Sequence, residues 1–305
     1  MSRSRGTAVA TALLCAALAT AGCGLGPGAD VGTVELTVTR DYGSAPMLER
    51  GVEVNESDTV MRVLEGSAEI ATRYGGGYVQ AIEGVEEAQR GGRPNAWFFY
   101  VDGVESPIGA AEYELGGGER IWWDYRDWAA TNHVPAVVGS WPAPFTAGYE
   151  GGEHPVAVEC RGGGGACALA RRALEDAGVS VAAGTPAGSI RLLVGPWERL
   201  RADPAAALIE AGPEESGVFA DFGRRRGEYV LSGLDQRGAP VREFGPDAGL
   251  VAATRRYEAP PVWVVTGATP AAVRAAAGLL SAAKLRDHYA VASEDGKETP
   301  LPVTR

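Results

Sequence analysis

Two aspartates beside tryptophans are the side chains of this sequence whose types and spacing come nearest to a chemical site. Asp124 and Asp127 lie next to Trp122 and Trp128. Carboxylates close to aromatic rings are typical of carbohydrate sites, where two acids act on a glycosidic bond from opposite sides. Two acids three residues apart on or near one strand seldom reach a bond from both sides. Ion pairs with the neighbouring arginines are the role that the sequence favours.

A glycine-rich loop at 162–165 is the second candidate, because it separates an expected strand from an expected helix, as in a phosphate-binding loop. No Lys-Ser or Lys-Thr follows the glycines, and Cys167 stands where a dinucleotide-binding fingerprint has its third glycine. Cys160 and Cys167 flank the loop, and such a pair outside the cytoplasm is usually oxidised. The sequence therefore predicts a disulfide-closed loop rather than a nucleotide site.

Further catalytic or metal-binding patterns are missing from the sequence. His133, His154 and His288 lie far apart, and none has metal-ligand spacing with a cysteine or another histidine. The chain has no Gly-x-Ser-x-Gly nucleophile elbow. We therefore expect no metal and no enzymatic activity, and we keep a hydrolase with its site in the second half as the less favoured alternative.

Composition limits the class of protein. The chain has 305 residues, 45% of them hydrophobic, which is enough for two domains with cores of their own. Its formal net charge is −11. Proteins that bind DNA or RNA carry a clustered basic face, and this sequence has none. A nucleic-acid partner is therefore not expected.

The first 23 residues predict secretion and a lipid anchor. Arg3 and Arg5 precede the uncharged, largely apolar stretch 7–21, as in a secretory signal peptide of residues 1–22. The stretch ends in Ala-Thr-Ala-Gly before Cys23, which resembles the lipobox of bacterial lipoproteins. Lipid on Cys23 would hold the protein at the extracytoplasmic face of the cell membrane. An ordinary cleaved signal peptide is the alternative.

Aromatic residues are concentrated at 97–128, where nine of them lie within 32 residues. The run 97–101 ends in Asp102-Gly103, the dipeptide that a two-residue type I′ hairpin prefers, and the run 120–126 follows a glycine turn, so both are expected strands. Alternation puts Trp97, Phe99 and Trp123 on core-facing positions.

The opposite positions of these two strands predict a binding surface. Trp122 alternates with charged residues, so its face is expected to be wet, with Phe98, Tyr100 and Trp122 forming an exposed aromatic platform. The alternative is that a loop or the C-terminal half covers this face. The predicted ligand-binding residues are Phe98, Tyr100, Trp122, Asp124 and Trp128.

These strands belong to a longer series of motifs. The series comprises 34–38 (Val-Glu-Leu-Thr-Val), 57–64 (Ser-Asp-Thr-Val-Met-Arg-Val-Leu), 78–84 (Tyr-Val-Gln-Ala-Ile-Glu-Gly), 97–103, Gly109 with Tyr113, and 118–123 (Gly-Glu-Arg-Ile-Trp-Trp). In this order the motifs resemble the transcobalamin-like C-terminal domain family of bacterial surface lipoproteins, over about residues 33–128. The resemblance implies a β-grasp-like fold and a surface location. It also implies cobalamin as a ligand, because the related domain of vertebrate cobalamin carriers closes over the corrin ring.

The expected organisation is α+β, with a tether at 23–32, a β-grasp-like domain at 33–130 and a linker at 131–153. An α/β domain follows at 154–292, and 293–305 is expected to be a flexible tail. The expected function is a lipid-anchored, extracytoplasmic binding protein, a small-molecule or corrinoid-binding component that serves a membrane importer. A cell-wall glycan or protein-interaction module is the alternative. No resident cofactor is expected.

Overall fold

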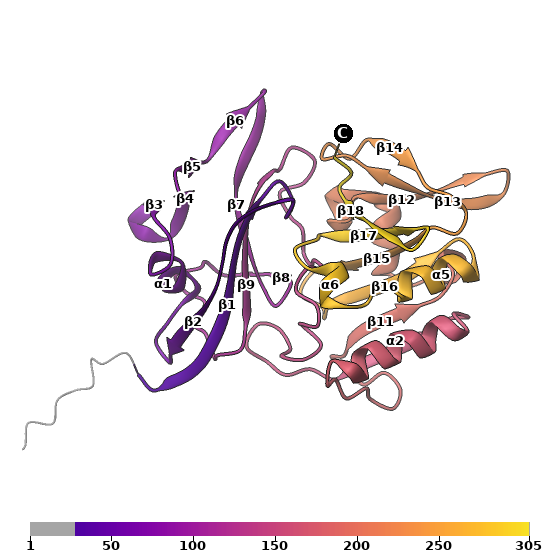
Figure 1. Ribbon diagram of the computed structural model, residues 1–305, viewed down its shortest axis with the longest axis horizontal. Helices are drawn as coiled ribbons and strands as arrows, with labels where there is room; N and C mark the ends of the chain where they lie inside the picture. Colours follow the sequence, from indigo (N-terminus) through magenta and orange to yellow (C-terminus); the bar gives the residue numbers. More distant parts are fainter. Residues whose placement is uncertain (1–27, 305) are drawn as a thin grey trace, which may run out of the picture.

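The computed structural model describes residues 28–304, so the predictions for Cys23 and for the signal segment 1–22 lie outside the described residues. The chain is a mixed α+β protein in which sheets outweigh helices. Each half is built on a six-stranded sheet accompanied by a three-stranded one, and the halves lie side by side (Figure 1). Within 28–304, no helix has the length and apolar character needed to cross a membrane.

The sheet of the first half has the strand order β2-β1-β9-β7-β6, with β8 also paired to β7. Its strands are β1 (Asp30–Arg40), β2 (Ala45–Asn55), β6 (Ala88–Arg90), β7 (Arg93–Val101), β8 (Val104–Glu105) and β9 (Arg120–Asp127). β1 pairs with β9 in parallel, whereas the other pairs are antiparallel. The two aromatic strands expected from the sequence are β7 and β9, and they are direct neighbours.

The hairpin between β7 and β8 is confirmed. Asp102 and Gly103 have φ values of 52° and 78°, the left-handed conformation that a type I′ turn needs at both central positions. Val101 pairs with Val104 across the turn. Asp102 also accepts a hydrogen bond from Arg120 N at 2.9 Å, which ties the turn to the start of β9.

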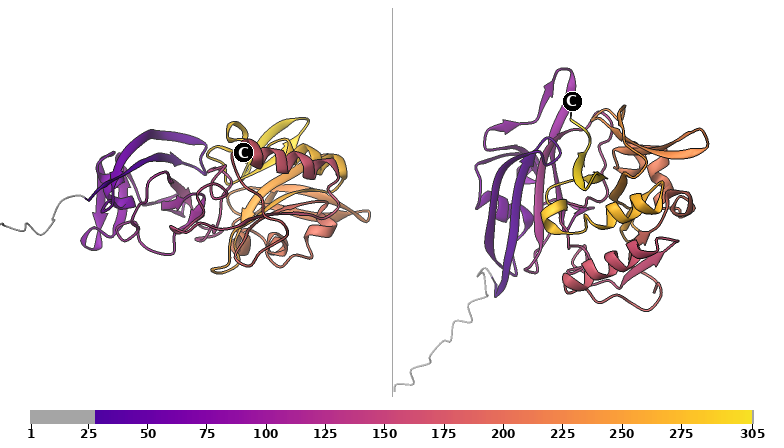
Figure 2. Two further views of the ribbon diagram at one scale, coloured as in Figure 1. Left: turned by 90° about the horizontal axis from the view of Figure 1, so that it is seen from below. Right: turned by 45° about the vertical axis from the view of Figure 1, so that its right-hand side comes forward.

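Short elements cover the face of this sheet that points away from the second half (Figures 1 and 2). They are α1 (Val60–Glu65), β3 (Ile70–Arg73), the 3₁₀ turn η1 (Tyr74–Gly76), β4 (Tyr78–Ile82) and β5 (Val85–Glu86). The N-cap of α1 is Thr59, whose side chain accepts a hydrogen bond from Arg62 N. Met61 and Leu64 of α1 pack with Trp123 in the first half's core.

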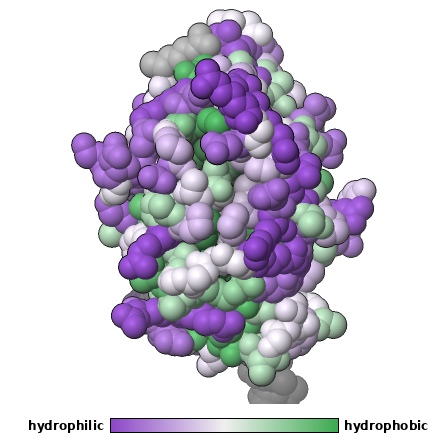
Figure 3. All heavy atoms as spheres, turned by 90° about the vertical axis from the view of Figure 1, so that its right-hand side faces the viewer, coloured by the Kyte–Doolittle hydropathy of each residue, from purple (hydrophilic) through white to green (hydrophobic). Residues whose placement is uncertain are grey.

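The second half combines a mixed sheet, in the order β10-β11-β16-β15-β17-β18, with the small antiparallel sheet β12-β13-β14. Its strands are β10 (Val156–Cys160), β11 (Ile190–Val194), β12 (Ala220–Arg225), β13 (Glu228–Leu234), β14 (Pro240–Glu243), β15 (Gly249–Thr254), β16 (Val262–Gly267), β17 (Ala290–Glu294) and β18 (Lys297–Leu301). Its helices are α2 (Gly165–Asp176), α3 (Trp197–Leu200), η2 (Ala206–Ala211), α4 (Pro213–Ser216), α5 (Pro270–Ala277) and α6 (Ala282–Leu285). Figure 3 shows polar and charged side chains over its outer face, with apolar side chains in small patches between them.

α5 ends at Ala277 and α6 begins at Ala282, so the two are separate helices. Two expectations for the second half need correction. β15 was not foreseen, although it lies inside the sheet between β16 and β17. The segment 293–305 is not a loose tail, because Lys297–Leu301 forms β18 and pairs with β17.

One hydrophobic cluster contains residues from both halves. Tyr100 and Trp122 from the first half lie in the same buried cluster as Phe219 and Tyr289 from the second. The expected linker 131–153 also takes part in the packing, since Val137 is completely buried there. The face of β9 that carries Trp122 is therefore covered by the C-terminal half, which was the alternative to an exposed platform.

Candidate functional site

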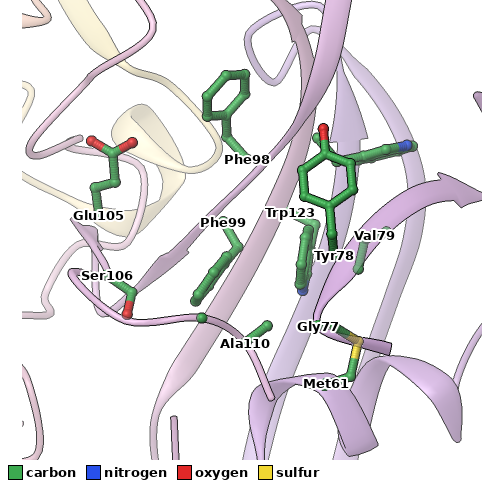
Figure 4. Close-up of a pocket in the computed structure, with 12 residues that line it drawn as sticks. Met61, Gly77, Tyr78, Val79, Phe98, Phe99, Glu105, Ser106, Ala110 and Trp123 are labelled. Carbon is green, nitrogen blue, oxygen red and sulfur yellow. The ribbon is translucent and has the colours of Figure 1, made fainter. Parts of the chain in front are cut away.

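The candidate site is a pocket of about 280 Å³ beside β7, on the first half of the chain (Figure 4). Side chains and backbone from β7, β9, β4, α1 and the segment after β8 enclose it. The lining residues are Met61, Gly77, Tyr78, Val79, Trp97, Phe98, Phe99, Glu105, Ser106, Gly109, Ala110 and Trp123. Its size lies near the lower end of the range of small-molecule sites.

Aromatic rings supply the walls. Phe99 and Trp123, on neighbouring strands, are stacked with their ring centroids 4.9 Å apart and an interplanar angle of 28°. Figure 4 shows Tyr78 of β4 beside Trp123, and Met61 of α1 below it. Trp97 closes another part of the wall, and it is held in place by a 2.9 Å hydrogen bond from its Nε1 to Val85 O. Such walls suit a ligand with an apolar, preferably flat, body.

One hydrogen-bond donor in these walls is unused. The indole Nε1–H of Trp123 has no acceptor among residues 28–304, although the side chain is only 3% exposed. The indole of Trp122, next in sequence, donates to Thr39 Oγ1 at 2.8 Å. A buried N–H without an acceptor costs free energy, because it has given up its hydrogen bonds to water.

The polar groups at the rim are held by other protein groups. Glu105 accepts a hydrogen bond from Val134 N at 3.1 Å and forms an ion pair with His133 Nδ1. The hydrogen bond to Glu105 raises the pKa of His133. Tyr78 donates to Glu87 at 3.2 Å, and burial raises the pKa of Tyr78 to about 12, so its hydroxyl keeps its proton at neutral pH.

Phe98 lines the pocket and also contacts the buried side chain of Arg126. Its ring is half-buried, and the guanidinium of Arg126 lies 3.7 Å from the ring centroid, a close cation–π contact. Arg126 itself is completely buried and donates to Thr131 O at 2.8 Å. Of the five ligand-binding residues predicted from the sequence, Phe98 is the one that lines this pocket.

The exposed platform expected from the sequence is wrong. Tyr100 and Trp122 are 0% exposed. Both rings pack on Tyr289 of the second half, with ring centroids 5.7 Å and 5.3 Å from it. The second half fills the space in which a ligand was expected.

Asp124 is a structural acceptor in that closed region. It is completely buried and accepts hydrogen bonds from Thr39 Oγ1 at 2.6 Å, Tyr42 N at 3.0 Å, Gly43 N at 3.2 Å and Tyr289 Oη at 3.0 Å. Burial raises the pKa of Asp124. The expectation of a wet, salt-linked edge fails for this residue.

The other two predicted acidic and aromatic positions lie at the end of β9. Asp127 forms an ion pair with Arg93 at 2.7 Å. An ion pair with an arginine was expected, but with one next to Asp127 in the sequence. Trp128 is half-buried, and its backbone N–H donates to Pro94 O at 3.0 Å. Neither side chain reaches the pocket.

The disulfide between Cys160 and Cys167 is confirmed, with a Cα–Cα separation of 5.9 Å. It closes the glycine-rich loop between β10 and α2. Within 28–304, no group of three or more His, Cys, Asp or Glu side chains is arranged to hold a metal ion.

Sequence reasoning missed most of the pocket, because it assigned Trp97, Phe99 and Trp123 to a closed core. These residues do pack with the core, yet a space remains beside them where β7 loses its neighbouring strands. Pro107, shortly after β8, is the sequence signal that could have indicated this, since proline cannot donate to a strand ladder.

One family model matches a segment in the first half of the chain. Residues 57–127 match the family described as "Domain of unknown function (DUF4430)", and every residue that lines the pocket lies within this match. No curated protein matches the chain. A solved structure described as a "putative metal binding protein from Ruminococcus gnavus ATCC 29149" is similar, with 14% identity over 32% of this chain and 97% of that chain, at a TM-score of 0.24. A likeness of this size says nothing about the chemistry of this chain.

Proposed function

We propose that this protein is a non-enzymatic binding protein, held at the extracytoplasmic face of the membrane by lipid on Cys23, and that it takes its ligand in the pocket beside β7. The observation that carries the proposal is the pocket itself, whose walls include the stacked rings of Phe99 and Trp123, and the indole N–H of Trp123 has no acceptor among the described residues. Apolar walls with a few unsatisfied polar groups are the usual composition of a small-molecule site.

The pocket favours a ligand with an apolar body and one hydrogen-bond acceptor. The acceptor would meet Trp123 Nε1, and the body would lie against Phe99 and Met61. The resemblance to the transcobalamin-like family supports a β-grasp-like first half and makes cobalamin the first small molecule to try. A whole corrin ring is larger than 280 Å³, so only an edge or a side chain of a corrinoid would enter. In this proposal a membrane importer receives the ligand.

The glycan alternative receives no support from the geometry. It depended on acids and rings around Trp122 and Asp124, and both side chains are completely buried. We therefore do not propose a carbohydrate site.

The proposal is tested by native mass spectrometry of the full chain, extracted from its own membranes in mild detergent. We expect a mass consistent with lipid on Cys23 and, on part of the protein, an additional non-covalent small molecule. Trp123→Phe keeps a ring of similar shape and removes only the N–H, so it should weaken retention of that molecule. Trp122→Phe is the matched control, because it removes an N–H that is outside the pocket.

Equal loss of the bound molecule from both variants, or no bound molecule and no binding of added cobalamin, would contradict the proposed site. The anchor is tested separately with Cys23→Ala, which should abolish lipid attachment and release the protein from the membrane. Correct processing and membrane retention of that variant would contradict the lipid anchor.

A further inference from the structure

We infer that the ligand of this pocket carries a quaternary ammonium group, a nitrogen with four carbon substituents and a permanent positive charge. The inference rests on the proposed function, since it uses the same pocket and gives the chemical class of its ligand. Of the 12 residues that line the pocket, five have aromatic rings, one has a carboxylate, and none is Lys, Arg or His. Aromatic rings together with a carboxylate attract a cation.

The aromatic rings reach the pocket from three strands. Tyr78 belongs to β4, Phe98 and Phe99 belong to β7, and Trp123 belongs to β9. Tyr78, Phe98 and Phe99 are half-buried, so part of each side chain is open to a ligand. Figure 4 shows Phe99 and Tyr78 on different sides of Trp123. The face of an aromatic ring carries negative partial charge, so a cation in this pocket would be attracted by more than one ring.

One ring of the wall already holds a cation of the protein itself. The guanidinium of Arg126 lies 3.7 Å from the ring centroid of Phe98. Arg126 is completely buried and does not line the pocket. Asp124, two residues earlier on the same face of β9, interacts electrostatically with Arg126 and opposes its charge. Arg126 therefore takes one face of Phe98, and the rings of Tyr78 and Phe99 remain for a ligand.

Glu105 supplies the negative charge of the wall. Its Oε2 accepts a hydrogen bond from Val134 N at 3.1 Å and forms the ion pair with His133. Its Oε1 takes part in no hydrogen bond with another described residue. The Glu105 side chain is only 17% exposed, so water screens its charge less than that of a surface carboxylate. A positive group in the pocket is attracted by this charge without having to touch it.

The small number of free acceptors favours a methylated nitrogen over one with N–H groups. A primary ammonium brings three N–H donors, and each costs free energy if it is buried without an acceptor. Both hydroxyls of the wall are already engaged. Ser106 Oγ donates to Ile108 O at 2.8 Å and accepts from Ile108 N at 3.2 Å, and the Tyr78 hydroxyl donates to Glu87. A quaternary ammonium has no donor to satisfy, and its methyl groups can contact the rings directly.

The test compares two molecules of the same shape on the full chain by isothermal titration calorimetry. Choline carries a trimethylammonium group, and 3,3-dimethyl-1-butanol has a carbon atom in place of the nitrogen and no charge. Both have the same hydroxyl, so the difference in their affinities reports the charge. We expect choline to bind about tenfold more tightly. Equal affinity, or tighter binding of the neutral alcohol, would overturn the inference.

Ethanolamine separates a quaternary from a primary ammonium. It has the two-carbon chain, the hydroxyl and the positive charge of choline, but its nitrogen carries three N–H donors in place of three methyl groups. Because the wall offers few acceptors for these donors, ethanolamine should bind about tenfold more weakly than choline. Equal or tighter binding of ethanolamine would overturn the assignment to a quaternary nitrogen.

Substitutions assign the preference for the charge to this pocket. Phe99→Leu removes a ring and keeps an apolar side chain, and Glu105→Gln removes the charge and keeps the shape. Each should lower the ratio of choline affinity to alcohol affinity by about threefold. This ratio compares two ligands on one protein, so a general loss of folded protein does not change it. Glu112→Gln, at an exposed carboxylate outside the pocket, is the control and should leave the ratio unchanged. A ratio that neither Phe99→Leu nor Glu105→Gln lowers would overturn the inference.

Failure of this inference can be told apart from failure of the proposed function. If choline does not bind, and the native protein carries another small molecule that Trp123→Phe releases, the quaternary ammonium is excluded and the binding site stands. If neither choline nor another molecule binds, both are overturned.

Discussion

The two neighbouring tryptophans of β9, which point to opposite sides of the sheet, differ in whether their indole N–H has an acceptor. Trp122 is completely buried beneath the second half, and its indole donates to Thr39. Trp123 is nearly as buried, yet its indole has no acceptor among the described residues and borders a pocket. The side with the charged residues is buried between the two halves, whereas the apolar side borders the pocket. Charge along a strand therefore does not indicate by itself which face is free.

The largest expected effect tests whether the Trp122 side is closed. Trp122→Ala removes a ring that packs between Tyr100 and Tyr289, and it should lower the free energy of unfolding by about 3–5 kcal/mol. Urea unfolding followed by circular dichroism measures this change. A loss below about 1 kcal/mol, typical of an exposed position, would mean that the two halves do not close on this face.

The second prediction concerns pH and Asp102, at the end of the closed face. Burial raises the pKa of Asp102 to about 7. Because this lies above the unfolded-state value of about 3.9, the folded protein binds the proton more tightly, and this contribution to stability falls as pH rises from about 4 to 7. Asn also tolerates the left-handed conformation of the turn.

Asp102→Asn should therefore gain stability relative to the natural protein as pH rises. Between pH 5 and 8 the relative gain should be on the order of 2–3 kcal/mol, from urea unfolding of both proteins at each pH. A difference between the two proteins that stays constant with pH would show that Asp102 is not held in a desolvated site.

A smaller effect compares the two indole N–H groups directly. Trp122→Phe removes the donor to Thr39 in a closed core and should cost about 1–2 kcal/mol beyond the change in packing. Trp123→Phe removes a donor that has no acceptor, so the loss of stability beyond the change in packing should be near zero. Thermal unfolding of both variants shows the difference, and equal losses would contradict the contrast between the two sides.

The smallest effect lies at the rim of the pocket. The His133 side chain is 62% exposed, so its ion pair with Glu105 should contribute less than about 1 kcal/mol. Because the pKa of His133 is raised in the folded protein, the ion pair contributes fully to stability below the unfolded-state pKa of about 6.5. This contribution is lost as pH rises through the folded-state pKa. His133→Gln should thus reduce stability slightly at pH 6 and not at pH 9. The same loss at both values would mean that protonation of His133 is not involved.

Local features of the chain could be predicted from the sequence because they depend on neighbouring residues. The Asp102-Gly103 turn depends on two residues with positive φ, and the disulfide of Cys160 depends on a short flexible loop. Helix α2 follows the same loop, where a helix was expected. β15 was missed, since its small residues show no alternation. Its first residue, Gly249, lies so close to α5 that a Cβ there would come within 2.2 Å of Ala272 O.

The candidate site could not be predicted in the same way, because it depends on partners far away in the chain. Alternation correctly grouped Trp122 with Asp124, but it could not show what covers them. The covering hydrogen bond comes from Tyr289, 165 residues beyond Asp124. The pocket, in turn, arises where two strands leave β7, and side-chain periodicity carries no information about such a departure.

The position of Tyr289 also bears on how the protein can be made. A chain that emerges from the ribosome, or from a secretion pore, presents its N-terminal half first. The apolar surface of Tyr100 and Trp122 therefore stays uncovered until Tyr289, near the C-terminal end of the described chain, has been synthesised. Until that moment the nascent protein exposes aromatic residues to other chains, so interrupted synthesis should produce fragments that aggregate or engage chaperones.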